Sequence, residues 1–248
     1  MAVASYIICA TPRSGSTLLC DLLGQTGVAG RPDSFYRRES RADFVRQFGI
    51  ETGRGLDAER RFLAAVIEAG TGGTGMFGLR IMWPSMPALQ QTLAGLFPDA
   101  ATDAARINDA FGSPLYIHLR RRDRIAQAIS RSKAEQSGLW HRFADGRARE
   151  QVNNYQAPRY DRAQIESCLA ETEAHETAWR GWFATNSIVP LELAYEDLSA
   201  DPAATLAHVL AALGRDPAIA SDIGIKSGRL ADAESRAWAE RYLREVAR

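Results

Sequence analysis

Apolar residues follow two patterns along this chain, short continuous runs and stripes with helical spacing. Four runs have the length expected of buried strands: residues 6–10, 76–83, 115–119 and 188–193. Seven stretches have helical spacing: residues 17–23, 56–69, 86–97, 123–136, 164–183, 203–213 and 233–246. Strands that alternate with helices predict a single α/β domain over residues 1–248, with a central, mostly parallel sheet flanked by helices.

Four polar segments lie between these elements. Residues 27–36 form a loop with two glycines and a proline, and residues 37–48 carry charges that are typical of a solvated helical face. Residues 70–75 form a glycine-rich turn, and no lysine follows it as a nucleotide loop requires. Residues 138–163 are long, irregular and polar, which indicates a lid over a site or a contact with a partner.

The composition is ordinary for a globular protein, with 46% hydrophobic and 24% charged residues. The 30 basic and 30 acidic residues cancel, so bulk attraction to nucleic acid or an acidic membrane is not expected. We expect no leader, because the apolar run from Tyr6 is too short and no basic region or cleavage site accompanies it. We expect no membrane span, because no apolar run reaches the length of about 18 residues that a span needs. Cys9, Cys20 and Cys168 are too widely spaced for a disulfide framework or a zinc site, and they indicate a reducing cytoplasm.

The turn after the first predicted strand concentrates groups that bind anions. A proline and a glycine mark a tight turn within residues 11–16, and a helix follows. A strand, a tight polar loop and a helix together direct backbone N–H groups and a positive helix end toward an anion. Arg13 adds a permanent cation, and Ser14, Ser16 and Thr17 add hydroxyl donors. The loop is therefore predicted to hold a phosphate or a sulfate.

The spacing within this loop excludes several familiar phosphate loops. A Walker A loop has a lysine after its last glycine, whereas Ser16 follows Gly15 here. A phosphatase loop has an arginine six positions after its cysteine, and that position after Cys9 is a glycine. The dinucleotide pattern of three glycines is absent from this turn. A kinase with arginine in place of the lysine stays open as an alternative, which magnesium-dependent ATP binding would favour.

The loop resembles the 5′-phosphosulfate loop of sulfotransferases, which use 3′-phosphoadenosine 5′-phosphosulfate (PAPS) and need no metal. The resemblance implies that Arg13 is catalytic and stabilises charge on the leaving phosphate. The residues that it assigns to the phosphosulfate are Arg13, Ser14, Gly15, Ser16, Thr17 and Leu18. It also implies a 3′-phosphate site after a later strand, where Arg121 and Ser130 match the expected arginine and serine. Arg120 and Arg122 are neighbours, so the arginine can shift by one position.

A closer resemblance, to the bacterial trehalose 2-sulfotransferase family, extends over nearly the full length in matching order. The stretches that carry it are Arg13-Ser-Gly-Ser-Thr-Leu-Leu19, Thr26-Gly-Val-Ala-Gly30, Met82-Trp83 after Arg80, Gln127-Ala128, Trp179-Arg-Gly-Trp-Phe183, Ala211-Ala-Leu-Gly-Arg-Asp-Pro217, Trp238 and Arg241-Tyr242. The resemblance implies the family's fold, a parallel sheet with a nucleotide-binding core, and homodimers.

The loop after residue 30 departs from that family. The trehalose enzymes have Glu-Pro-Gln-Glu-Phe-Phe there, and the second glutamate is their proposed base. This chain has Ser34 at the position of the base and Arg31 in place of the first glutamate. A serine of ordinary pKa cannot act as the base without an activator, so we expect Asp33 to take that role. Arg31 suggests an anionic glycan or glycolipid acceptor, and trehalose is not expected.

The sequence thus predicts a PAPS-dependent sulfotransferase that acts on a hydroxyl of a carbohydrate or glycolipid by direct in-line transfer. The residues expected to contact the acceptor are Arg31, Asp33, Ser34, Phe35, Arg80 and Trp83. Arg229 is expected to touch a phosphate of the donor nucleotide, and His118 is expected to be an ordinary core histidine. The kinase and a nucleotide-binding pseudoenzyme without a base remain as alternatives.

Overall fold

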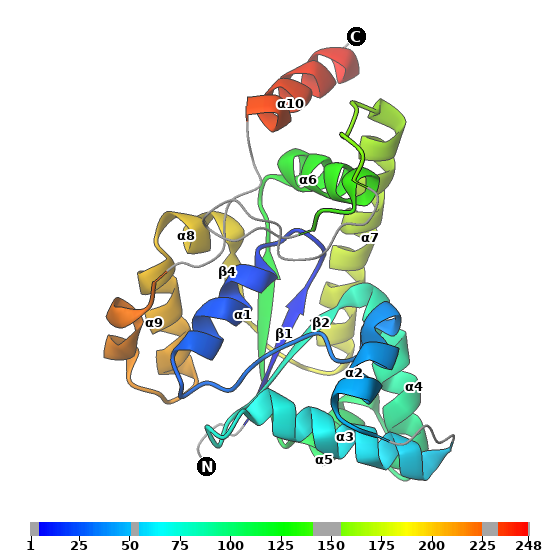
Figure 1. Cartoon of the computed structure of the whole chain (residues 1–248), viewed down its shortest axis with the longest axis vertical. Coiled ribbons are helices and arrows are strands. Elements are labelled where there is room, and N and C mark those ends of the chain that lie inside the picture. The colour runs from blue at the N-terminus through cyan, green and yellow to red at the C-terminus, as the bar shows by residue number, and fades with distance from the viewer. Residues whose placement is uncertain (1–4, 51–54, 141–154, 225–232, 248) are drawn as a thin grey trace.

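The computed structural model describes residues 5–50, 55–140, 155–224 and 233–247. A four-stranded sheet lies at its centre, and every pair of neighbouring strands is parallel. The strands follow the order β2-β1-β3-β4 across the sheet (Figure 1), with β1 at Ser5–Ala10, β2 at Phe77–Met82, β3 at Leu115–Arg120 and β4 at Leu191–Ala194. The predicted parallel α/β architecture is therefore confirmed.

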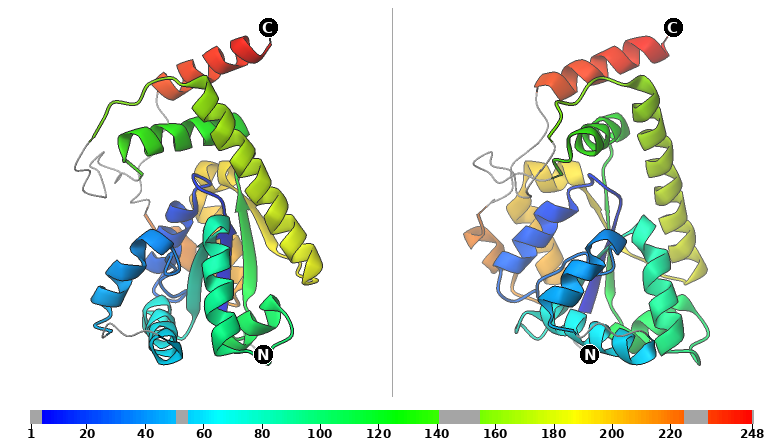
Figure 2. Two further views of the ribbon diagram at one scale, coloured as in Figure 1. Left: turned by 90° about the vertical axis from the view of Figure 1, so that its right-hand side faces the viewer. Right: turned by 45° about the vertical axis from the view of Figure 1, so that its right-hand side comes forward.

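Helices pack on both faces of the sheet and above the carboxyl ends of its strands (Figures 1 and 2). The α-helices are α1 (Ser16–Gln25), α2 (Arg41–Gln47), α3 (Leu56–Thr71), α4 (Met86–Leu96), α5 (Asp103–Phe111), α6 (Arg124–Ser137), α7 (Arg162–Thr185), α8 (Tyr195–Ala200), α9 (Pro202–Ala212) and α10 (Ala233–Val246). The described residues also form three short 3-10 helices, at Arg38–Ser40, Trp83–Ser85 and Pro217–Asp222. Within the described ranges, no helix is both long and apolar enough to cross a membrane.

The side chains of β1 point alternately to the two faces of the sheet, and the hydrophobic core is divided into a cluster on each face. Ile7 and Cys9 belong to a cluster with side chains from α3, α4, α5 and α7. Tyr6, Ile8 and Ala10 belong to a second cluster, with side chains from α1, α8 and α9. Successive residues of a strand point to opposite faces, so a six-residue strand that is buried throughout must have a hydrophobic layer on each side.

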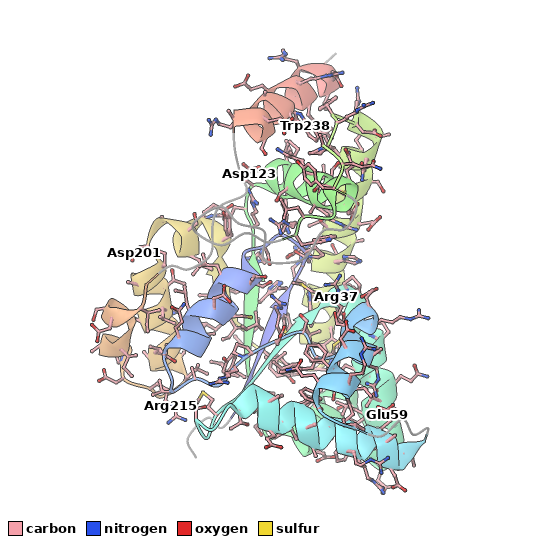
Figure 3. The ribbon with its side chains drawn as sticks, in the orientation of Figure 1. Arg37, Glu59, Asp123, Asp201, Arg215 and Trp238 are labelled. Carbon is pink, nitrogen blue, oxygen red and sulfur yellow. The ribbon has the colours of Figure 1, made fainter. Side chains whose placement is uncertain are left out.

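A third cluster lies away from the sheet, where α6, α7 and α10 meet. Its buried residues are Ala128, Ile129, Ile165, Cys168, Trp238 and Tyr242. Trp238 lies on α10 in this cluster (Figure 3). Asp123, also labelled there, caps α6 by accepting a hydrogen bond from the amide of Ala126 at 2.9 Å. This cluster holds α6 above the carboxyl ends of the strands, next to the loop that leaves β1 (Figure 2).

The strand order reverses direction at one place. From β1 the chain crosses to β2 on one side, and β3 then lies on the other side of β1. The connections after β1 and β3 therefore diverge at the carboxyl ends of these two strands. Open parallel sheets bind their ligands at such a switch point. The predicted anion loop follows β1, and Arg121 follows β3, so both lie at this point.

The structure differs from the predicted elements in two respects, and a third prediction is mostly untested. The fourth strand begins at Leu191 instead of residue 188, because Pro190 has no N–H for the ladder and Val189 is 92% exposed. Helices α5 and α8 were not expected, since both are short and only partly apolar. Most of the predicted irregular segment, at residues 141–154, lies outside the described residues.

Candidate functional site

Residues 11–15 connect β1 to α1 in a backbone conformation that few residue types accept. Arg13 has a φ of 65° and Gly15 a φ of 87°. A Cβ atom on Gly15 would also lie 2.4 Å from Cδ2 of Tyr195, so only glycine fits there. A positive φ at an arginine costs about 1–3 kcal/mol, and such residues cluster at functional sites. The start of α1 has no side-chain cap, so its N–H groups face the loop, as in anion-binding turns.

The hydroxyl groups of the loop differ in their surroundings. Ser14 and Ser16 are buried, whereas Thr17 and Leu18 are partly exposed. Oγ of Ser14 has no hydrogen-bond partner within the described part of the chain. Oγ1 of Thr17 accepts a hydrogen bond from Nη1 of Arg80 at 2.9 Å. Ser14 therefore keeps an unused donor in the loop, and Thr17 is joined to the neighbouring strand.

Arg13 reaches from the loop to α6 and the segment that follows it. Its Nε donates to Oγ of Ser130 at 3.0 Å, and its Nη1 donates to the carbonyl oxygen of Trp140. The resemblance to sulfotransferases assigns Arg13 to the 5′-phosphosulfate and Ser130 to the 3′-phosphate. The structure brings these two residues into direct contact.

The three successive arginines after β3 have different partners. Nε of Arg120 lies 2.9 Å from Oε2 of Glu192, and Arg122 forms ion pairs with carboxylates of α8. Arg121 is only 9% exposed, and its Nε has no hydrogen-bond partner among the described residues. Its Cζ lies 4.6 Å above the ring of Tyr195. A buried cation without a hydrogen-bonded anion costs free energy, so this environment favours Arg121 among the three as the anion ligand.

Burial also lowers the pKa of Arg121, an effect that Tyr195, Asp123 and Glu196 partly offset. Glu196 accepts hydrogen bonds from the amides of Arg122 and Asp123, each at 3.0 Å. The first turn of α8 thus fixes the connection between β3 and α6. Tyr195 lies between Gly15 and Arg121, because its ring contacts both.

The predicted acceptor loop runs beside β2, and Arg80 joins it to α1. The amide of Arg80 donates to the carbonyl oxygen of Asp33 at 3.1 Å. Nε of Arg80 donates to Oγ of Ser34 at 2.7 Å, and its Nη2 lies 3.4 Å from Oδ1 of Asp33. Oδ1 of Asp33 also accepts from the amide of Ser34 at 2.6 Å, and about half of the Asp33 side chain is exposed. The structure therefore brings Arg80, Asp33, Ser34 and Thr17 together.

The remaining predicted acceptor residues lie apart from this group. Atoms of the Arg31 side chain pack over Gly72, just after α3. Phe35 is 4% exposed and packs in the core, with its ring centroid 5.2 Å from that of Phe44. Trp83 is partly buried and packs edge-on against Trp179. Arg229, which is expected to touch the donor nucleotide and not the acceptor, lies outside the described residues.

A buried carboxylate beneath the loop escaped sequence analysis. Glu176 on α7 is 2% exposed, and Oγ1 of Thr11 donates to its Oε1 at 3.1 Å. Its Oε2 lies 3.4 Å from Nε2 of His118, which is fully buried as a core histidine. The sequence does contain a signal that could have identified Glu176. Its helical spacing from Thr172 and Trp179 places this carboxylate on the buried face of α7.

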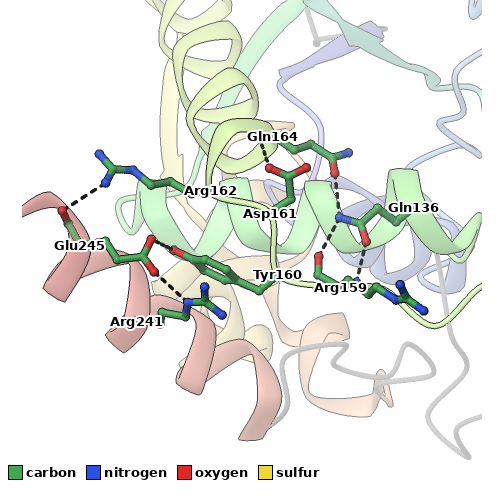
Figure 4. Close-up of a pocket in the computed structure, with 8 residues that line it drawn as sticks. All are labelled: Gln136, Arg159, Tyr160, Asp161, Arg162, Gln164, Arg241 and Glu245. Atoms are coloured by element: carbon green, nitrogen blue, oxygen red, sulfur yellow. Dashed lines mark hydrogen bonds and ion pairs between the residues drawn. The ribbon is translucent and has the colours of Figure 1, made fainter.

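Two other features of the described residues bear on ligand binding. Among the described residues, no group of three or more His, Cys, Asp or Glu side chains is placed to hold a metal ion. A cavity of about 500 Å³ lies where α6, α7 and α10 meet (Figure 4). Its lining residues are Gln136, Arg159, Tyr160, Asp161, Arg162, Gln164, Arg241 and Glu245, none of which belongs to the site described above.

Comparisons with known proteins agree with the resemblance drawn from the sequence. The chain is 32% identical over 269 residues to the trehalose 2-sulfotransferase of Mycobacterium tuberculosis (strain ATCC 35801 / TMC 107 / Erdman), a match that covers 100% of this chain and 97% of that protein. It is 31% identical to the trehalose 2-sulfotransferase of Mycolicibacterium smegmatis (strain ATCC 700084 / mc(2)155), over 98% of this chain and 96% of that protein.

A solved sulfotransferase structure from Alicyclobacillus acidocaldarius covers 100% of this chain with 14% identity and a TM-score of 0.45, and 94% of that structure is covered in turn. That likeness is too low to carry an argument. The Stf0 sulphotransferase profile matches residues 5–245. Because this match spans nearly the whole chain, the protein is a sulfotransferase and belongs to the Stf0 sulphotransferase family.

Proposed function

We propose that this sulfotransferase moves a sulfuryl group from PAPS to a hydroxyl of a carbohydrate or glycolipid. The observation that carries the proposal is Arg121, a buried guanidinium whose Nε has no hydrogen-bond partner among the described residues, beside an anion loop. PAPS has a phosphosulfate at one end and a 3′-phosphate at the other. Two anion sites that adjoin one another suit such a donor better than a donor without the 3′-phosphate.

The residues divide between the two ends of the donor. The N–H groups of the loop and the start of α1, with Arg13, would hold the 5′-phosphosulfate. Arg121 and Ser130 would hold the 3′-phosphate, since a planar guanidinium can donate to two oxygens at once. PAPS, when bound, supplies the activated sulfuryl group. Arg13 and the N–H groups then stabilise the negative charge that develops on the leaving phosphate more than they stabilise the ground state.

On the acceptor side, Asp33 is the proposed base. Its carboxylate is half exposed, so an acceptor hydroxyl can approach it. Nη2 of Arg80 and the amide of Ser34 hold Oδ1 of Asp33 in place. Arg80 also donates to Thr17, so the acceptor loop and the start of α1 are fixed relative to one another. The relatives are named for trehalose; Ser34 replaces their proposed base here, and we propose a different carbohydrate or a glycolipid as the acceptor.

Two further expectations accompany this proposal. No disulfide joins Cys9, Cys20 and Cys168, which supports the reducing cytoplasm as the compartment. Homodimers are expected from the resemblance to the trehalose enzymes.

Calorimetric titration with adenosine 3′,5′-bisphosphate and with ATP tests the donor class. We expect tight binding of the bisphosphate, weaker binding of ATP with or without magnesium, and loss of bisphosphate binding in Arg121→Ala. Equal or tighter binding of ATP would contradict the proposal. Sulfation of any carbohydrate acceptor from PAPS above background would then exclude a pseudoenzyme.

A further inference from the structure

Four side chains behind the loop form a closed ring of polar contacts. Nη1 of Arg124 donates to Oε1 of Gln127 at 3.2 Å, and Nε2 of Gln127 donates to Oγ1 of Thr11 at 2.9 Å. Thr11 donates its hydroxyl proton to Oε1 of Glu176 at 3.1 Å. The ring closes where Nη2 of Arg124 lies 3.3 Å from Oε2 of Glu176. The hydroxyl of Thr11 thus donates to Glu176 and accepts from Gln127.

The ring lies in the protein interior and carries charge. Thr11, Gln127 and Glu176 are all at most 2% exposed. Burial acts to raise the pKa of Glu176, but contacts with His118 and Arg124 outweigh it and hold the pKa below the usual value. Glu176 is therefore an anion at neutral pH. A buried anion is unfavourable unless it is paired and hydrogen-bonded, so these partners must stay in place around it.

The ring and one neighbouring contact fix three successive residues at the carboxyl end of β1. Nε1 of Trp179 donates to the carbonyl oxygen of Ala10 at 3.0 Å. Glu176 holds the side chain of Thr11, and Gln127 donates to the carbonyl oxygen of Pro12 at 2.8 Å. Arg13 is the next residue. Side chains of α6 and α7 therefore fix the position of the anion loop.

The ring also joins the two anion sites. Arg124 and Gln127 belong to α6, the helix that carries Ser130 and that begins three residues after Arg121. Glu176 contacts both Thr11 in the loop and Arg124 in α6. A displacement of the loop relative to α6 would therefore break contacts of a buried charge.

We propose that Glu176 is a positioning residue for the donor, which holds the loop after β1 at a fixed distance from Arg121 and Ser130. The inference rests on the proposed function, because it assumes a ligand with a phosphate in each site. Such a ligand gains affinity when the two sites are held at the right separation before it binds. A ligand with a single phosphate gains nothing from that separation.

Titration of two ligands separates this role from a merely structural one. Adenosine 3′,5′-bisphosphate and 5′-AMP are titrated into the wild type, Glu176→Gln, Thr11→Val and the control Glu173→Gln, which changes an exposed carboxylate on the same helix. We expect bisphosphate affinity to fall roughly 10-fold in Glu176→Gln and in Thr11→Val, and 5′-AMP affinity to fall less than about 3-fold. The double variant should lose little more than either single variant, because both changes break the same contact.

The outcomes distinguish the inference from the function on which it rests. Equal loss for both ligands, or no loss, would overturn the role of Glu176 while the wild type still prefers the bisphosphate. A wild type without that preference would overturn the proposed donor as well. Thr11→Val keeps Glu176 paired with His118 and Arg124, so it tests the link even when Glu176→Gln does not fold.

Discussion

Nε of Arg13 donates a hydrogen bond to Oγ of Ser130 at 3.0 Å, although the two residues are 117 positions apart in the chain. The first belongs to the loop after β1, and the second to α6. Their contact places the two predicted anion sites next to one another, so a ligand that spans them would meet residues from both elements.

The Ser130 hydroxyl is expected to contribute to the donor site directly. Ser130→Ala removes a partner of Arg13 and a proposed ligand of the 3′-phosphate. Hydrogen bonds to charged groups contribute about 1.5–3 kcal/mol, so we expect affinity for adenosine 3′,5′-bisphosphate to fall by roughly 10-fold or more. Calorimetry measures the change, with Ser167→Ala on the exposed face of α7 as the control. Unchanged affinity would remove Ser130 from the site.

Arg121 is expected to bind the donor and to lower the stability of the ligand-free protein. It is buried and its Nε has no hydrogen-bond partner in the described ranges, so Arg121→Met should leave the thermal midpoint of the ligand-free protein unchanged or raise it. The same variant should lose the increase in midpoint that adenosine 3′,5′-bisphosphate gives the wild type. Thermal unfolding with and without the bisphosphate measures both effects. A large fall in the ligand-free midpoint would show that Arg121 is a structural residue.

Asp33 and Ser34 are expected to differ in their effect on turnover. Asp33→Asn removes the proposed base, and general-base catalysis contributes about 10²–10⁴-fold, so kcat should fall by that order while donor KM stays nearly constant. Ser34→Ala removes only a hydroxyl that accepts from Arg80 and should lower kcat far less. Steady-state kinetics with any acceptor found for the enzyme measures the difference. The reverse order of effects would assign the base role to the serine.

Acid should weaken the fold through Glu176. Its pKa lies below the usual 4.5 in the folded protein, so its ion pairs stabilise the fold above pH 4.5 and this contribution is lost as the pH falls through the lower, folded value. Glu176→Gln should therefore be less stable than the wild type by about 2 kcal/mol near neutral pH. The difference should shrink below pH 4.5. Urea unfolding across this range measures it, and a constant difference would contradict the assignment.

Much of the fold was predictable because its signals are local. The strand at β1 and the stripe of α3 follow from apolar spacing within a few residues, and α10 was predicted with its observed bounds. The start of β4 was not, since Val189 continues the apolar run in the sequence and only the structure shows that its side chain is exposed.

The site could be predicted only where one segment contained the signal. Turn residues and donors within a few positions predict the anion loop around Arg13, and the resemblance to sulfotransferases implies Arg121; both stay predictions. Glu176 is 165 positions from Thr11, so no local pattern links the two. Phe35 was expected near the acceptor on its position in the loop, but only the packing of α2 shows that its ring faces Phe44 in the core.

The central claim is that one donor bridges the loop after β1 and Arg121. A crystal structure of the protein with adenosine 3′,5′-bisphosphate tests it most directly. We predict the 5′-phosphate on the N–H groups at the start of α1, next to Arg13, and the 3′-phosphate on the guanidinium of Arg121 and the hydroxyl of Ser130. A bisphosphate bound with neither phosphate on Arg121, or bound away from the loop after β1, would contradict the account.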